Sequence, residues 1–152
     1  MVCALALVSF SLVTAQKTYT YKFQDAAVNP EYVRNYQIDV GKEDVHFVVS
    51  SGTKTYFDEV RVINKYQYKA FIANITECYV NKKPDATNDG CTGGTTETFS
   101  IKDGNNTVEG YVYRCGGTEY GNLKGDVAKA AKLFKDMVPG FDYKLSTTTL
   151  KK

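Results

Sequence analysis

The chain has 152 residues, of which 43% are hydrophobic and 24% are charged, a size and composition that suit one globular domain. Its 19 basic and 17 acidic side chains nearly cancel, and they form no long basic stripe, so we expect no nucleic-acid partner. The composition also excludes a polytopic membrane protein, a collagen-like fibre and a fully disordered chain.

The N-terminal residues 1–15 predict a secretory signal peptide. Residues 2–13 are almost continuously apolar, yet this run is too short to span a bilayer as a helix. Val13 and Ala15 provide a cleavage site, so we expect a mature chain from Gln16 that is secreted to the extracellular space. No later apolar run is long enough for a membrane span, so the mature chain is not expected to be membrane-spanning.

Residues 16–145 predict a single β-rich domain. Aromatic and β-branched residues alternate with polar ones, and turn signals such as Ser51-Gly52 and Asp103-Gly104 separate the segments. The hairpin around Gly104 suits a turn with this glycine in the left-handed region. The predicted strands cover residues 19–23, 36–40, 45–49, 56–63, 66–72, 78–80, 98–102 and 107–114.

One helix is predicted near the C-terminus. Apolar residues recur at spacings of three and four from Leu123 to Val138, Asn122 or Asp126 can cap the start, and Pro139-Gly140 ends the pattern. Residues 141–145 return to alternation as a short last strand, and residues 146–152 form a flexible tail. We therefore expect a mainly β fold, a curled antiparallel meander of about eight strands that forms a half-barrel or barrel, with this one helix.

Secretion favours disulfide formation among the cysteines that follow the signal peptide. Of the three pairings, Cys78–Cys91 closes the shortest loop and is preferred, which leaves Cys115 as a free buried thiol or as an intermolecular link in a homodimer. The spacing does not fit a zinc site. Residues 85–90 echo half of an EF-hand loop, but ligand positions are missing, so neither a metal nor a cofactor is predicted.

Two N-x-S/T sequons predict a glycoprotein. Asn105 lies in a predicted turn tip, and Asn74 lies close to a predicted strand and to Cys78.

Catalytic chemistry has few candidates. The only histidine, His46, falls in the middle of a predicted strand, and no nucleophile-elbow, zinc-protease or phosphate-loop motif is present. We therefore expect a protein that is not an enzyme.

The interior of a curled sheet offers a site for an apolar ligand, such as a lipid, if the helix does not fill it. The alternative is a solidly packed structural or adhesive protein that interacts with extracellular matrix components and forms a disulfide-linked dimer. The candidate lining residues are the large inward-facing ones: Phe23, Tyr36, Ile38, Phe47, Val49, Phe71, Phe99, Ile101 and Val112.

Residues 36–83 resemble the ependymin-related secreted proteins. The strand that ends in Tyr36-Gln37-Ile38-Asp39 precedes Val45-His46-Phe47, and the segments 56–62, 66–68 and 78–83 follow in the order seen in that family. The resemblance implies a curved antiparallel sheet in a secreted, often glycosylated protein associated with extracellular matrix, calcium-influenced adhesion and apolar ligands. The order of meander, late helix and final strand also resembles the lipocalins.

Overall fold

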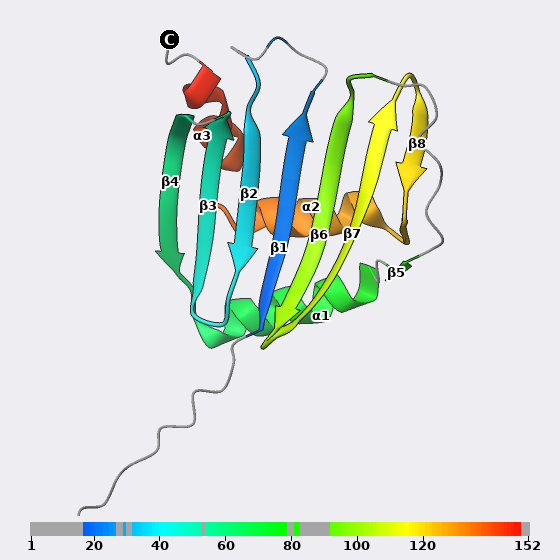
Figure 1. The fold of residues 1–152 in the computed structure, drawn as a ribbon. Helices are drawn as coiled ribbons and strands as arrows, with labels where there is room; N and C mark the ends of the chain where they lie inside the picture. Colours follow the sequence, from blue (N-terminus) through cyan, green and yellow to red (C-terminus); the bar gives the residue numbers. More distant parts are fainter. Residues whose placement is uncertain are drawn as a thin grey trace, which may run out of the picture.

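The computed structural model describes residues 17–26, 29, 32–52, 54–78, 81–82 and 92–149, with residues 81–82 and 149 described by their backbone alone. Seven strands form one antiparallel sheet in the order β4-β3-β2-β1-β6-β7-β8 (Figure 1). These strands are β1 (Thr18–Asp25), β2 (Asn35–Val40), β3 (Asp44–Ser51), β4 (Lys54–Val62), β6 (Thr95–Asp103), β7 (Asn106–Cys115) and β8 (Thr118–Gly121). Two short strands, β5 (Asn81–Lys82) and β9 (Leu123–Lys124), pair separately.

The sheet consists of two meanders that meet in its centre. Strands β1 to β4 run consecutively toward one edge, and β6 to β8 run toward the other. The junction is the pairing of β1 with β6, which extends from Thr18↔Lys102 to Asp25↔Thr95. The chain therefore has to return from the β4 edge to the centre before it can build the second meander.

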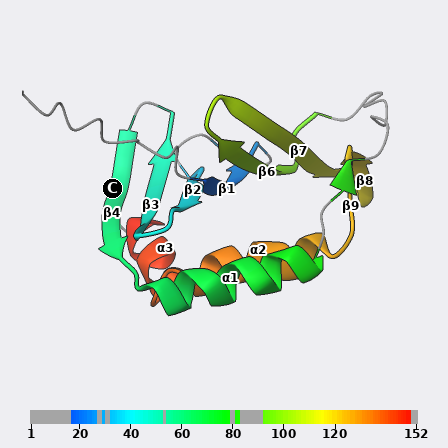
Figure 2. The same cartoon turned by 90° about the horizontal axis from the view of Figure 1, so that it is seen from below.

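Helix α1 (Lys65–Cys78) makes this return, and α2 (Val127–Asp136) and α3 (Phe141–Thr149) follow the last strand. All three helices lie on the same face of the sheet (Figure 2). On that covered face, β1, β2 and β3 bury alternate residues, as period-two patterning requires. The opposite face of these strands carries half-buried and exposed side chains, most of them polar.

The predicted mainly β fold and its antiparallel meander are confirmed, but the sheet does not close into a barrel. It keeps two separate edges, β4 and β8. Three helices cover the apolar face instead of one, so burial of that face does not require closure. No helix in the described part of the chain is long and apolar enough to cross a bilayer.

The prediction of a strand at residues 66–72 is wrong, because helix α1 occupies 65–78. Of the predicted strand at 78–80, Cys78 belongs to the helix, and residues 79–80 lie outside the described residues. Asn64 caps the helix by accepting hydrogen bonds from the backbone N–H groups of Tyr66 and Gln67 at 2.9 and 3.0 Å. The Gln67 side chain accepts in return from the Asn64 N–H at 3.0 Å, which completes a capping box. Phe71 and Cys78 then turn inward at helical spacing.

The predicted last strand at residues 141–145 and the flexible tail from residue 146 are also wrong. Phe141 to Thr149 form helix α3, while residues 150–152 lie outside the described residues. Gly140 adopts a φ of 67° directly before this helix, and Phe141 and Thr148 are buried on it. The predicted helix is confirmed as α2, with Asp126 as its N-cap; the side chain of Asp126 accepts from the Lys129 N–H at 2.9 Å.

Two clusters of buried side chains lie between the sheet and the helices. The large one joins β1, β2 and β3 to all three helices, and the small one consists of Val112, Leu123 and Val127. Phe99 on β6 packs against both clusters. The space between the clusters is where a pocket opens.

Candidate ligand pocket

A pocket of about 230 Å³ lies between the covered face of the sheet and helices α1 and α2. Strands β1, β6 and β7 form one wall, and the other wall comes from the two helices and from Leu123 on β9. The lining residues are Lys17, Tyr19, Ile75, Thr76, Phe99, Ser100, Ile101, Val108, Glu109, Gly110, Leu123 and Phe134.

The β7 wall is thin because Gly110 has no side chain where it faces Phe99 of β6. Leu123 packs against this glycine so closely that a Cβ atom at position 110 would collide with its side chain. Further along β7 the next residue on the same face is Val108, which is smaller than the aromatic residues on β1. The helices therefore rest on bulky rings at β1 and β6 and leave space beside β7.

The mouth of the pocket is apolar although it faces solvent. Val108 is 59% exposed and its cross-strand partner Ile101 is 38% exposed. Charged side chains stand at the rim. Lys17 lies over the ring of Tyr19, with its Nζ 5.6 Å from the ring centroid, and pairs loosely with Asp103 at 3.9 Å.

Two of the predicted lining residues, Phe99 and Ile101, border this pocket. Tyr36, Ile38, Phe47, Val49 and Phe71 instead fill the large core cluster, Phe23 packs against it, and Val112 belongs to the small cluster. The sequence interpretation missed Ile75 and Thr76, since it placed this stretch among strands. The capping box at Asn64 and Gln67 was the signal that could have located the helix and, with it, the second wall.

A partly buried ionic network lies beyond Phe99, toward β8. The Tyr21 hydroxyl donates to Glu97 at 2.7 Å, Arg114 donates to the other carboxylate oxygen, and Arg114 Nε reaches Glu119 at 3.1 Å. Burial, reinforced by Tyr36 and Glu97, raises the pKa of Tyr21 far above its usual value. Burial lowers the pKa of Arg114, but the hydrogen bond and charge of Glu97 outweigh this and raise it overall. The partners of Glu97 satisfy its charge, so this network ties β1, β6, β7 and β8 together.

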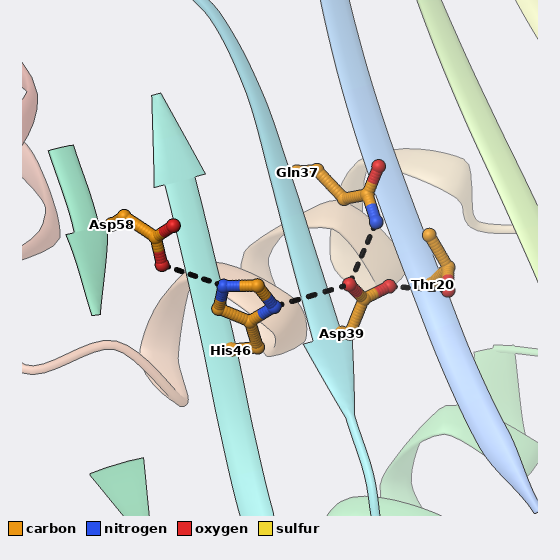
Figure 3. A network of polar contacts seen from close by, with 5 residues as sticks. All are labelled: Thr20, Gln37, Asp39, His46 and Asp58. Atoms are coloured by element: carbon orange, nitrogen blue, oxygen red, sulfur yellow. Dashed lines mark hydrogen bonds and ion pairs between the residues drawn. The ribbon is translucent and has the colours of Figure 1, made fainter. Parts of the chain in front are cut away.

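His46 belongs to a second polar network, on the uncovered face of the sheet (Figure 3). Its Nε2 lies 2.7 Å from Asp58 and its Nδ1 lies 4.0 Å from Asp39. Thr20 and Gln37 both donate to Asp39, at 2.5 and 2.7 Å. These contacts link side chains of strands β1 to β4 across the uncovered face.

The preferred disulfide between Cys78 and Cys91 is wrong, because Cys78 is a free, buried thiol at the end of α1. Burial raises the pKa of the Cys78 thiol, which disfavours the reactive thiolate. Cys115, predicted to be the free or intermolecular thiol, is disulfide-bonded. Cys91 lies outside the described residues. The physical reason is the helix, which carries Cys78 into the interior below the sheet.

The sequon asparagines are both exposed in the structure, Asn74 on α1 and Asn105 in the turn between β6 and β7. The predicted turn is confirmed, with Gly104 at a φ of 60°. The EF-hand-like residues 85–90 lie outside the described residues. Elsewhere, in the part of the chain that the structure describes, no three His, Cys, Asp or Glu side chains gather closely enough to hold a metal ion.

No family model matches the chain, and no curated protein matches its sequence.

Proposed function

We propose that this protein is a secreted, non-enzymatic glycoprotein that binds a small apolar molecule in the pocket between β6, β7 and the helices. The observation that carries the proposal is the pocket itself, whose walls are formed largely by Tyr19, Ile75, Phe99, Leu123 and Phe134. Water gains few hydrogen bonds from such walls, so an apolar guest can displace it favourably.

The volume of the pocket limits the size of the guest. Drug-sized ligands occupy pockets of roughly 300 to 1,000 Å³, whereas an apolar cavity of about 150 Å³ is sufficient for benzene. At about 230 Å³, the pocket suits a molecule of one or two rings, or a short acyl chain, and it does not enclose a whole lipid. The apolar mouth at Ile101 and Val108 allows a longer chain to extend outward.

The exposed sequon asparagines support the secretory part of the proposal, because a glycan requires an accessible side chain. Expression in a secreting eukaryotic cell tests it. We expect the secreted chain to begin at Gln16 and to lose mass on treatment with an N-glycosidase. In Asn105→Gln, this loss of mass should be smaller by one glycan. A chain that stays in the cell, or that carries no glycan, contradicts this part.

A structural or adhesive role is the second candidate. It is favoured by the filled β1–β4 half of the molecule, where the predicted lining residues Ile38, Phe47 and Val49 are at most 2% exposed and pack as core. Such a protein needs no ligand, so binding measurements separate the two functions.

The ligand proposal is tested by calorimetry with straight-chain alcohols of increasing length. Each methylene that enters the pocket should tighten binding about fourfold, and the gain should stop when the pocket is full. Val108→Trp, which places a large ring at the mouth, should abolish binding. Val60→Trp is the matched control, since Val60 is exposed to a similar extent, 62% against 59%, but lies on the opposite face.

Binding that is independent of chain length, or that survives Val108→Trp, contradicts the proposed site. If none of the alcohols binds, the ligand function is rejected in favour of the structural one.

A further inference from the structure

Strand β4 forms an open edge of the sheet, where it pairs with β3 on one side and with no described strand on the other (Figure 1). The backbone N–H of Ile63, directly after β4, donates to the Glu43 carbonyl at 2.9 Å. This bond shows which residues of β4 direct their backbone groups toward β3. Along an antiparallel strand, the backbone N–H and C=O groups of successive residues point alternately to one side and to the other. Arg61 and Glu59, like Ile63, therefore point these groups toward β3. The N–H and C=O groups of Asp58, Val60 and Val62 therefore point outward from the edge.

The same outward-pointing residues carry exposed apolar side chains. Val60 is 62% exposed and Val62 is 81% exposed, both on the face that no helix covers. Proteins usually protect a long edge strand by charge, by proline or by a bulge, because its free backbone groups attract another strand. Strand β4 carries the charged residues Asp58, Glu59 and Arg61 and a register shift opposite Val49 and Ser50, so a strand that pairs with it has to complement these charges. The opposite edge, β8, is only four residues long, and its Thr118 and Glu119 are exposed polar residues.

We propose that β4 is an interface with a second copy of this chain, in which the two β4 strands pair antiparallel about a two-fold axis at Val60. A second copy is the occupant that the charges of β4 fit. Like charges opposite each other destabilise a strand pair. Among the axes at residues 58–62, one at Asp58, Glu59 or Arg61 would set that residue against its own copy, and one at Val62 would leave little overlap of the two strands.

An axis at Val60 avoids every such clash. It sets Val60 against Val60, Asp58 against Val62 of the second copy, and Glu59 against Arg61 of the second copy, twice by symmetry. Hydrogen bonds then join the outward-pointing residues, and Glu59 and Arg61 occupy the closer, non-hydrogen-bonded pairs. Within the described residues, Arg61 has no ion-pair partner of its own, whereas Glu59 contacts Lys144 of α3.

The resulting assembly is closed. A two-fold interface uses the same patch on both copies, so the two β4 edges are consumed and only the short β8 edges remain outside. The helices of both copies then lie on one side of the joined sheet. The strands that line the ligand pocket, β1, β6 and β7, are separated from the interface by β2 and β3. The interface is therefore independent of the proposed ligand function.

Sedimentation equilibrium under reducing conditions tests the proposal, since a disulfide-linked dimer would not survive reduction. We expect a reversible monomer–dimer equilibrium. Val60→Lys should weaken the dimer about tenfold by opposing two ammonium groups. Val62→Lys should leave it equal or tighter, because residue 62 faces Asp58 of the second copy.

Val108→Lys is the control, since it adds the same charge at an equally exposed valine away from the edge. A monomer at every concentration overturns the proposal. So does equal weakening by Val60→Lys and Val62→Lys, because the register would then be wrong.

Cysteine scanning provides a second readout that does not depend on affinity. In the proposed register, Val60→Cys places two thiols on facing residues about 5.5 Å apart at Cα, which lies within disulfide range. Val62→Cys separates its two thiols by four residues along the strand, about 13 Å. Cross-linking of the first variant and not of the second supports the interface, and the reverse pattern excludes it.

Discussion

The two halves of the sheet bury their covered face in different ways. In the β1–β4 half, aromatic rings on neighbouring strands meet rings from α3, with Phe141 at 5.1 Å from Tyr36 and 5.5 Å from Phe47. In the β6–β8 half, Gly110 and Gly121 occupy buried positions, and the core is reduced to Val112, Leu123 and Val127. The same period-two pattern therefore yields a filled core on one side and a pocket on the other.

The pocket therefore lies where the covered face carries small residues, such as Gly110 and Val108 on β7. Phe99 marks the boundary between the two halves. Its ring centroid lies 4.9 Å from that of Tyr21 and 6.1 Å from that of Phe134, and the same ring borders the pocket. Substitutions in the two halves should consequently lower the free energy of unfolding by different amounts.

The largest expected effect is that of Phe47→Ala. Phe47 is 2% exposed, and its removal should leave a closed cavity that lowers the free energy of unfolding by about 3 to 5 kcal/mol. Phe99→Ala should cost roughly half as much, because it enlarges a space that solvent already reaches. Urea denaturation measures both, and equal losses would contradict the distinction between the halves.

Gly110→Ala should lower the free energy of unfolding by about 1 to 3 kcal/mol, because the added methyl group collides with Leu123. The cost should fall in a Leu123→Ala background, where that side chain is absent. A double-mutant cycle by thermal or urea unfolding measures this coupling. Additive effects would mean that Gly110 and Leu123 do not define the wall of the pocket.

Two buried tyrosines at and beside the junction between the halves, Tyr21 and Tyr36, should make the stability of the protein sensitive to alkali. Burial raises the pKa of Tyr36 to about 12 and that of Tyr21 further, whereas the unfolded residues titrate near pH 10. The folded state then holds more protons than the unfolded state, so stability is complete below about pH 10 and falls as the pH rises toward 12.

Tyr21→Phe removes one of these two groups. The fall in the free energy of unfolding should become shallower by about 1.4 kcal/mol per pH unit over this range. At neutral pH the variant should lose about 1 kcal/mol, for the hydrogen bond to Glu97. Urea titrations at several pH values measure both quantities, and an unchanged alkaline slope would argue against a neutral, buried Tyr21.

The smallest expected effect is that of Asp58→Asn on the uncovered face. Asp58 is 61% exposed and its partner His46 is 39% exposed, so solvent screens the pair and the loss should stay below about 1 kcal/mol. A larger loss in urea denaturation would show that the polar network in Figure 3 contributes to the fold as much as the covered face does.

Local patterns in the sequence determined most of the strands and one helix. Alternation located β1 to β4 and the β6–β7 hairpin, Gly104 located its turn, and Asp126 with Pro139 bounded α2. Helix α1 was predicted as strand because Tyr66, Tyr68 and Ile72 imitate a period of two. The apolar contacts of α1, such as that of Phe71 with Phe134, form only when α2 packs beside it.

The sequence by itself thus determined the β-rich class and the identity of the residues able to face a core, since these follow from the spacing of apolar side chains along the chain. Only the tertiary structure decided that the sheet stays open, that Cys78 is buried by a helix, and that Phe99 and Ile101 line the candidate ligand pocket while Phe47 and Val49 do not. The reason is that a cavity depends on which side chains from distant segments meet across a layer, and this meeting is set by the path of the chain between β4 and β6.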